Sequence, residues 1–190
     1  VRMNDGRMIP MVGLGTFLKS RAMKFFRKQD DEISAEQQEQ DKKDDEKEER
    51  EFAHAVAVAI KNGYRHIDTA QAYRTEFVIG NALKTLFAEF TVLREEIFIT
   101  SKIARSIHQP DEIRASIEKS LKDLQTDYID LMLIHSPHSY NEEGKRGQDV
   151  IEKYQILHEY RKQGKIKSVG VSNFSVKHLE ILEKACPDLP

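Results

Sequence analysis

The feature that most constrains the fold is a regular alternation of strand-like and helix-like segments along most of the chain. Four short apolar runs end at Asp68, Lys102, His135 and Ser172, so that successive ends lie 34, 33 and 37 residues apart. The runs are continuously apolar, which is typical of parallel strands covered on both faces. A repeat of this length could also indicate a helical array, but the strand-rich ends favour successive βα units.

The expected elements follow from this pattern. Strands are predicted at 65–68, 96–102, 129–135 and 166–173, with a shorter strand at 11–17. Helices are predicted where apolar residues recur at helical spacing, beginning near Phe52, Ile79, Ile113, Val150 and Val176. The sequence Asn4-Asp5-Gly6 between short β-like runs predicts an N-terminal β-hairpin.

Parallel strands with helical crossovers form either an open doubly wound sheet or a closed (β/α)8 TIM-type barrel. An open dinucleotide-binding sheet should show G-x-G-x-x-G at its first helix, and GLGTF has only the first half of that pattern. The barrel is therefore favoured. About five βα units are present where a barrel needs eight, so residues 1–190 are predicted to form one incomplete α/β barrel domain with two open sheet edges.

The charge is unevenly distributed. Residues 30–51 hold 12 acids and 4 bases, and the rest of the chain is mildly basic. That body suits an anionic small molecule and is too weakly charged to predict nucleic-acid binding. Residues 18–50 are expected to be a charged insertion, helical or disordered, and either inert or a contact for a protein partner. One cysteine and no long apolar run predict a cytoplasmic protein without a membrane span, which we expect to be a monomer.

Reactive side chains stand at consecutive strand ends. In a (β/α)8 barrel the carboxyl ends of the strands meet at one face, so Asp68, Lys102, His135 and the nearby Tyr73 should converge. A phenol is a weak acid, and a neighbouring ammonium held by a carboxylate makes it a better proton donor. A neutral imidazole can orient a carbonyl oxygen. Because no side chain supplies a hydride, this set predicts carbonyl reduction with a nicotinamide cofactor.

Five motifs carry a resemblance to a known family. GLGTF, GYRHIDTAQAY, EIFITSK, DYIDLMLIHSP and GKIKSVGVSNF, in this order, resemble the aldo-keto reductases over nearly the whole chain except about residues 18–50. The resemblance implies reduction of aldehydes or ketones with NADPH. It makes Tyr73 the proton donor and Lys102 its activator, with Asp68 paired to Lys102 and His135 orienting the carbonyl.

The resemblance also implies binding residues. Ser172 and Asn173 would bind the nicotinamide carboxamide, while Gly15, Thr16 and Phe17 would line the first loop beside cofactor and substrate. Asp68 would also face the cofactor, and Phe17, Tyr73 and His135 would face the substrate. In the family, most contacts to the adenosine phosphate come from units beyond the five found here.

Two other functions stay open from the sequence. A chain with only part of a cofactor site could be a non-catalytic binding or regulatory module derived from a reductase. A metal-dependent barrel hydrolase would need several histidines and acids at the strand ends, and His66 with Asp68 would supply only a small part of that set. We expect no metal site.

Overall fold

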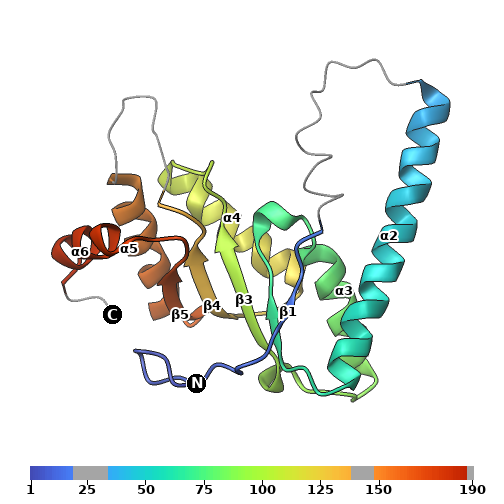
Figure 1. Cartoon of the computed structure of the whole chain (residues 1–190), viewed down its shortest axis with the longest axis horizontal. Coiled ribbons are helices and arrows are strands. Elements are labelled where there is room, and N and C mark those ends of the chain that lie inside the picture. Colours follow the sequence, from blue (N-terminus) through green and yellow to red (C-terminus); the bar gives the residue numbers. More distant parts are fainter. Residues whose placement is uncertain (19–33, 138–147, 188–190) are drawn as a thin grey trace.

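The computed structural model describes residues 1–18, 34–137 and 148–187, which build one parallel sheet with helices packed on it (Figure 1). Each strand pairs with the next strand along the chain, in the order β1-β2-β3-β4-β5. The strands are β1 (Leu14–Gly15), β2 (His66–Asp68), β3 (Phe98–Ile103), β4 (Ile129–Ile134) and β5 (Ile166–Val171). The prediction of an incomplete barrel-type α/β fold with five strands is confirmed.

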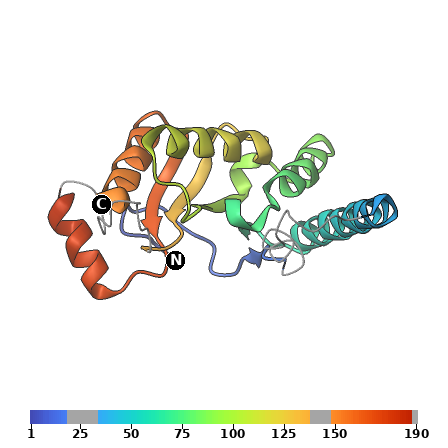
Figure 2. The same cartoon turned by 90° about the horizontal axis from the view of Figure 1, so that it is seen from above.

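Within the described residues, a helix follows each of the five strands. The helices are α2 (Ala35–Lys61), α3 (Glu76–Ala88), α4 (Pro110–Leu124), α5 (Gln148–Lys162) and α6 (Val176–Ala185), with 3-10 turns η1 (Gln71–Tyr73) and η2 (Arg94–Glu96). Figure 2 shows α3, α4 and α5 side by side over one face of the sheet. Their apolar stripes, including Ile79, Ile113 and Leu157, are buried against strand residues such as Ile99 and Ile129. This packing aligns the carboxyl ends of the strands.

The N-terminal segment differs in part from expectation. The predicted hairpin is present, since Arg2 and Met8 form an antiparallel bridge around a turn in which Gly6 has a φ of +86°. The predicted strand at 11–17 was too long, because only Leu14 and Gly15 pair with β2. Met11, with 83% of its surface exposed, lies outside the ladder. Of the three residues of β2, only Ile67 and Asp68 have partners in β1.

Helix α2 joins the charged segment to the domain. It is continuous from Ala35 to Lys61, and its second half packs on the core through Phe52, Val56 and Ile60. Figures 1 and 2 show its first half extending away from the body. Residues 35–50 of the predicted insertion are thus helical, whereas residues 19–33 lie outside the described residues. None of the described helices is both long and apolar enough to cross a membrane.

Candidate active site

The four predicted reactive residues lie together at the carboxyl end of the sheet. Asp68 is the last residue of β2, Lys102 lies near the end of β3, and His135 directly follows β4. Tyr73 ends the 3-10 turn η1, which the chain forms between β2 and α3. The parallel register places Asp68 beside Thr100, and this alignment brings the ends of β2 and β3 to one edge.

Lys102 is the centre of this group. Its ammonium donates to Oδ1 of Asp68 at 2.5 Å and to the carbonyl oxygen of Thr69 at 2.9 Å. The lysine side chain is 7% exposed, whereas the Asp68 side chain is 40% exposed. Such partners offset the cost of removing an ammonium from water. The arrangement therefore holds one positive charge at a fixed place near the rim of the sheet, the edge formed by the carboxyl ends of its strands.

The Tyr73 ring lies among the other side chains of the group. The Nζ of Lys102 is 5.1 Å from its ring centroid. The His135 ring packs edge-on against it at 5.6 Å between centroids, and Phe17 does the same at 5.3 Å. The predicted convergence of an acid, an ammonium, a phenol and an imidazole is present in the structure.

The electrostatics of His135 favour its neutral form. Burial lowers its pKa, and the positive charge of Lys102 lowers it further, although the Asp68 carboxylate opposes both effects. A neutral imidazole keeps one N–H donor and one acceptor nitrogen. At neutral pH the ring can therefore donate a hydrogen bond to an uncharged oxygen.

The residues expected to contact a cofactor lie on the same rim. Thr16 is buried, and both its backbone N–H and its hydroxyl donate to the carbonyl oxygen of Asp68, at 3.1 and 2.9 Å. Gly15 pairs with Asp68 in the ladder, and a Cβ built on Gly15 would meet nothing within 4 Å. Phe17 is 57% exposed.

At the other edge, Asn173 donates through Nδ2 to the carbonyl oxygen of His135 at 2.8 Å and to Oγ of Ser172 at 3.0 Å. Asn173 has a φ of 62°, a left-handed conformation that asparagine tolerates better than most residues. The end of β5 is thereby tied to the residue that follows β4. All nine predicted site residues lie at the carboxyl ends of the strands.

Sequence reasoning missed two residues that support Lys102. Thr69 accepts from the ammonium through its backbone carbonyl, a group that every residue carries and that no motif marks. The Thr75 hydroxyl is buried and lies 3.2 Å from the Thr69 hydroxyl and 3.4 Å from that of Thr16. These contacts link the start of α3, the end of β2 and the first loop.

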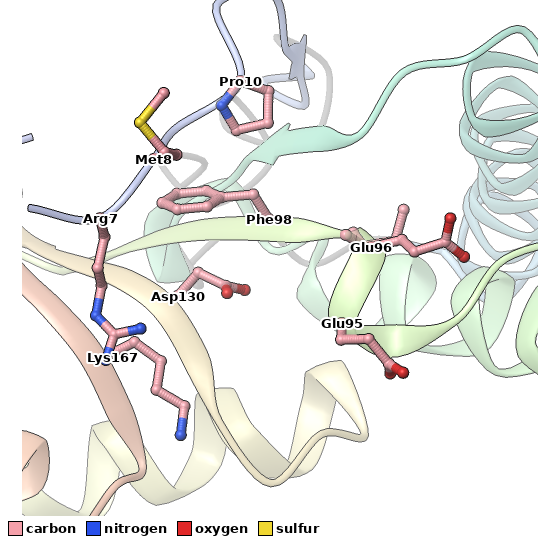
Figure 3. Close-up of a pocket in the computed structure, with 9 residues that line it drawn as sticks. Arg7, Met8, Pro10, Glu95, Glu96, Phe98, Asp130 and Lys167 are labelled. Carbon is pink, nitrogen blue, oxygen red and sulfur yellow. The ribbon is translucent and has the colours of Figure 1, made fainter. Parts of the chain in front are cut away.

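A cavity of about 410 Å³ lies at the opposite end of the sheet (Figure 3). It is lined by Arg7, Met8, Pro10, Glu95, Glu96, Ile97, Phe98, Asp130 and Lys167. These residues come from the N-terminal hairpin and Pro10 after it, from η2 and the residue after it, and from the amino ends of β3, β4 and β5. The cavity is therefore separate from the candidate active site.

A metal-dependent hydrolase would need a metal-binding site, and none lies in the part of the chain that the structure describes. Within those ranges, no group of three or more His, Cys, Asp or Glu side chains could hold a metal ion. His66 instead shares a hydrogen bond with the Thr100 hydroxyl at 2.9 Å and packs edge-on against Phe98. Its position is explained by packing between β2 and β3.

Comparisons with known proteins agree with this geometry. The family model described as Aldo/keto reductase family matches residues 35–189. Prostaglandin F synthase 1 of Bos taurus is 36% identical, and 3-alpha-hydroxysteroid dehydrogenase of Rattus norvegicus is 34% identical; each alignment covers 97% of this chain and 53% of the relative. The crystal structure of an aldo-keto reductase of Bombyx mori in complex with NADP superposes with a TM-score of 0.76 at 34% identity, covering 100% of this chain and 55% of that one.

The chain thus spans about half the length of the relatives that it matches. The family match includes the strands β2 to β5 and every candidate site residue from Asp68 to Asn173, whereas β1 and the first loop precede it. On the strength of the family match, the relatives and the shared fold, this chain belongs to the aldo/keto reductase family.

Proposed function

We propose that the protein reduces the carbonyl group of an aldehyde or ketone to an alcohol, with NADPH as hydride donor and Tyr73 as proton donor. The observation that carries the proposal is the Asp68–Lys102 ion pair of 2.5 Å, with the Tyr73 ring 5.1 Å from the same ammonium. Membership of the aldo/keto reductase family supports carbonyl reduction in general. The Bombyx mori relative in complex with NADP supports the choice of cofactor.

The residues on the rim fit the nicotinamide end of such a cofactor. The open space beside Gly15 would admit a flat ring next to Asp68. Ser172 and Asn173 offer a hydroxyl and an amide, which suit the carboxamide of a nicotinamide. When bound, NADPH supplies a hydride, which adds to the carbonyl carbon while the carbonyl oxygen takes up a proton.

The side chains of this chain would handle that proton. The Lys102 ammonium lies beside the Tyr73 ring, where it would stabilise the negative charge that develops on the phenol oxygen during proton transfer. Asp68 holds the ammonium in place without fully neutralising it, since the Asp68 side chain remains 40% exposed. The neutral His135 donates a hydrogen bond to the carbonyl oxygen and so directs it toward the Tyr73 hydroxyl.

The variant Tyr73→Phe tests this proposal in the complete natural protein. It removes the hydroxyl and keeps the ring contacts with Phe17 and His135. We expect turnover, followed as NADPH oxidation with an aromatic aldehyde, to fall by roughly 10²- to 10⁴-fold. The affinity for NADPH should be retained. Tyr64→Phe, at an exposed tyrosine outside the site, is the matched control and should keep full activity. Full turnover in Tyr73→Phe would refute the role of Tyr73.

The same experiment addresses the second function expected from the sequence. A non-catalytic module derived from a reductase would show no NADPH oxidation with any carbonyl, in the wild type as in Tyr73→Phe. A protein partner for residues 18–50, a monomeric state and a cytoplasmic location stay predictions. The buried free thiol of Cys186 is compatible with a reducing compartment.

A further inference from the structure

A buried carboxylate next to the candidate active site has no part in the proton transfer proposed above. Glu76 lies in the first turn of α3, and 5% of its surface is exposed. Its two carboxylate oxygens accept from the Ser101 hydroxyl at 2.6 Å and from the Ser120 hydroxyl at 3.0 Å. Both serines are fully buried, so one acid joins α3 to β3 and to α4 away from water.

Gln71 extends this network on the other side of Tyr73. Its Nε2 donates to Oγ of Ser120 at 3.0 Å and to the carbonyl oxygen of Ser116 at 2.9 Å. Its Oε1 accepts from the backbone N–H of Ala104 at 3.2 Å. Because Ser120 accepts from Gln71, its own hydroxyl hydrogen is available for Glu76. The hydrogen bonds therefore form one connected chain.

Gln71 and Glu76 lie on opposite sides of Tyr73 in the sequence, and two of their hydrogen-bond partners lie on opposite sides of Lys102. Gln71 and Glu76 stand two residues before and three residues after Tyr73. Ser101 directly precedes Lys102 on β3, and Ala104, the first residue after β3, follows Lys102 by two residues. Each side of the Tyr73 turn is thus bonded to one side of Lys102, once through Glu76 and once through Gln71.

We propose that Glu76 is a positioning residue, which acts with Gln71, Ser101 and Ser120 to hold Tyr73 at its distance from Lys102. The inference rests on the proposed function for its effect on turnover, but the geometry that it describes does not. Because proton transfer depends on the separation of the groups concerned, a small shift of the turn that carries Tyr73 would slow the reaction greatly.

A carboxylate at position 76 orients the neighbouring residues through directional hydrogen bonds, although it packs at a higher desolvation cost than an apolar side chain would. Burial raises the pKa of Glu76, while the hydrogen bonds from Ser101 and Ser120 oppose that rise. An apolar side chain would fill the same space without the desolvation cost of an acid. It would also leave two buried hydroxyls without their acceptor and the turn without a directional tether.

Three variants of the complete natural protein test the role. Glu76→Ala removes the acceptor, Gln71→Met removes the second tether with Glu76 in place, and Glu76→Gln keeps the shape and an acceptor oxygen. We expect kcat to fall on the order of 10- to 100-fold in the first two, with KM for the carbonyl changed by less than about threefold. Glu76→Gln should restore most of kcat. Ile79→Val, a fully buried change one turn further along α3, is the control for general loosening and should keep kcat.

A second readout does not need turnover. With 13Cζ-labelled tyrosine, the NMR resonance of Tyr73, assigned through Tyr73→Phe, should move in Glu76→Ala and Gln71→Met and keep its place in Glu76→Gln and Ile79→Val. If the wild type reduces no carbonyl, the proposed function fails, and this resonance still decides the positioning role. The inference would be overturned if the Tyr73 resonance moved in neither Glu76→Ala nor Gln71→Met. It would also be overturned if kcat fell equally in Glu76→Ala and Ile79→Val.

Discussion

Each end of the sheet holds an ion pair between a basic side chain and an aspartate, and the two pairs are built differently. At the amino end, Arg94 donates to Asp130 and to the carbonyl oxygens of Ile97 and Tyr128. It also donates to the Thr126 hydroxyl, and its guanidinium lies 4.0 Å above the Tyr128 ring. Four hydrogen bonds leave this cation little capacity for anything except structure.

At the carboxyl end, the Lys102 ammonium has three N–H donors, and two of them are directed to Asp68 and to the Thr69 carbonyl. The Tyr73 ring lies beside the same ammonium. Each cation keeps one N–H donor outside these bonds, so the difference lies in what surrounds it: Arg94 ties together backbone carbonyl oxygens at the amino end, whereas Lys102 lies beside a phenol that packs against an imidazole at the carboxyl end. In barrels of this type, the carboxyl face is where reactions occur.

The largest effect on activity is expected at the carboxyl end. Lys102→Met removes the charge beside Tyr73 and keeps the length of the side chain. We expect kcat to fall by roughly 10²- to 10⁴-fold, because the proton donor loses its activating ammonium. The melting temperature should change little, since the remaining Asp68 side chain reaches water. Steady-state kinetics and thermal melting of the same preparation check both parts, and an unimpaired kcat would contradict the role of Lys102.

The largest effect on stability is expected at the amino end. Arg94→Ala leaves Asp130, 18% exposed, without its cation, so we expect a loss of about 3 kcal/mol in the free energy of unfolding. Urea unfolding measures it, and kcat should stay within about twofold of wild type where the variant is folded. Arg114→Ala removes an exposed arginine that pairs with Glu159 and should lower stability far less. Equal losses in the two variants would contradict the comparison.

A smaller, pH-dependent effect is expected at Glu76. Its pKa in the folded protein is raised above 4.5 by burial, so the folded state binds more protons than the unfolded state. The contribution of Glu76 to stability is therefore present below about pH 4.5 and is lost as the pH rises through the raised pKa. Asp123 and Lys119 of α4 also act on this group, with opposite signs.

Glu76→Gln cannot titrate, so the melting temperature of the wild type minus that of Glu76→Gln should decrease as the pH rises from 4 toward neutrality. Differential scanning fluorimetry of both proteins across this range gives the difference directly. A difference that increases with pH would mean that the hydrogen bonds from Ser101 and Ser120 outweigh burial.

The smallest effect is expected on the exposed half of α2. Lys43 and Glu39 lie 3.4 Å apart, and more than half of each side chain is exposed. Lys43→Ala should change the free energy of unfolding by no more than about 0.5 kcal/mol and leave kcat unchanged, since solvent screens the pair. Circular dichroism with thermal melting checks this. A large loss of stability would show that this half of α2 contacts more than solvent.

Much of the site was predictable because parallel strands end at one face. Asp68, Lys102 and His135 could be placed together from their positions after apolar runs, and Tyr73 from its nearness to Asp68. The network of Gln71, Ser101, Ser120 and Glu76 could not, because hydrogen bonds between residues 25 to 49 positions apart leave no local pattern.

The fold, like the site, was predictable from the sequence only in part. Apolar periodicity predicted the strands and the buried half of α2 because burial selects residue types. It overestimated the strand at 11–17, since pairing there depends on the three-residue length of β2. The helix through Ala35–Arg50 follows no apolar stripe, and the sequence left both helix and disorder open.

A double-mutant cycle on kcat shows whether Lys102 acts through Tyr73. The rate of NADPH oxidation with one aromatic aldehyde would be measured for the wild type, Tyr73→Phe, Lys102→Met and the double variant. If Lys102 acts by activating Tyr73, the double variant should lose little more activity than Tyr73→Phe alone, because the ammonium has no phenol left to activate. Losses that multiply in the double variant would mean that Tyr73 and Lys102 act independently, which would contradict a single proton-donating unit at the carboxyl end of the sheet.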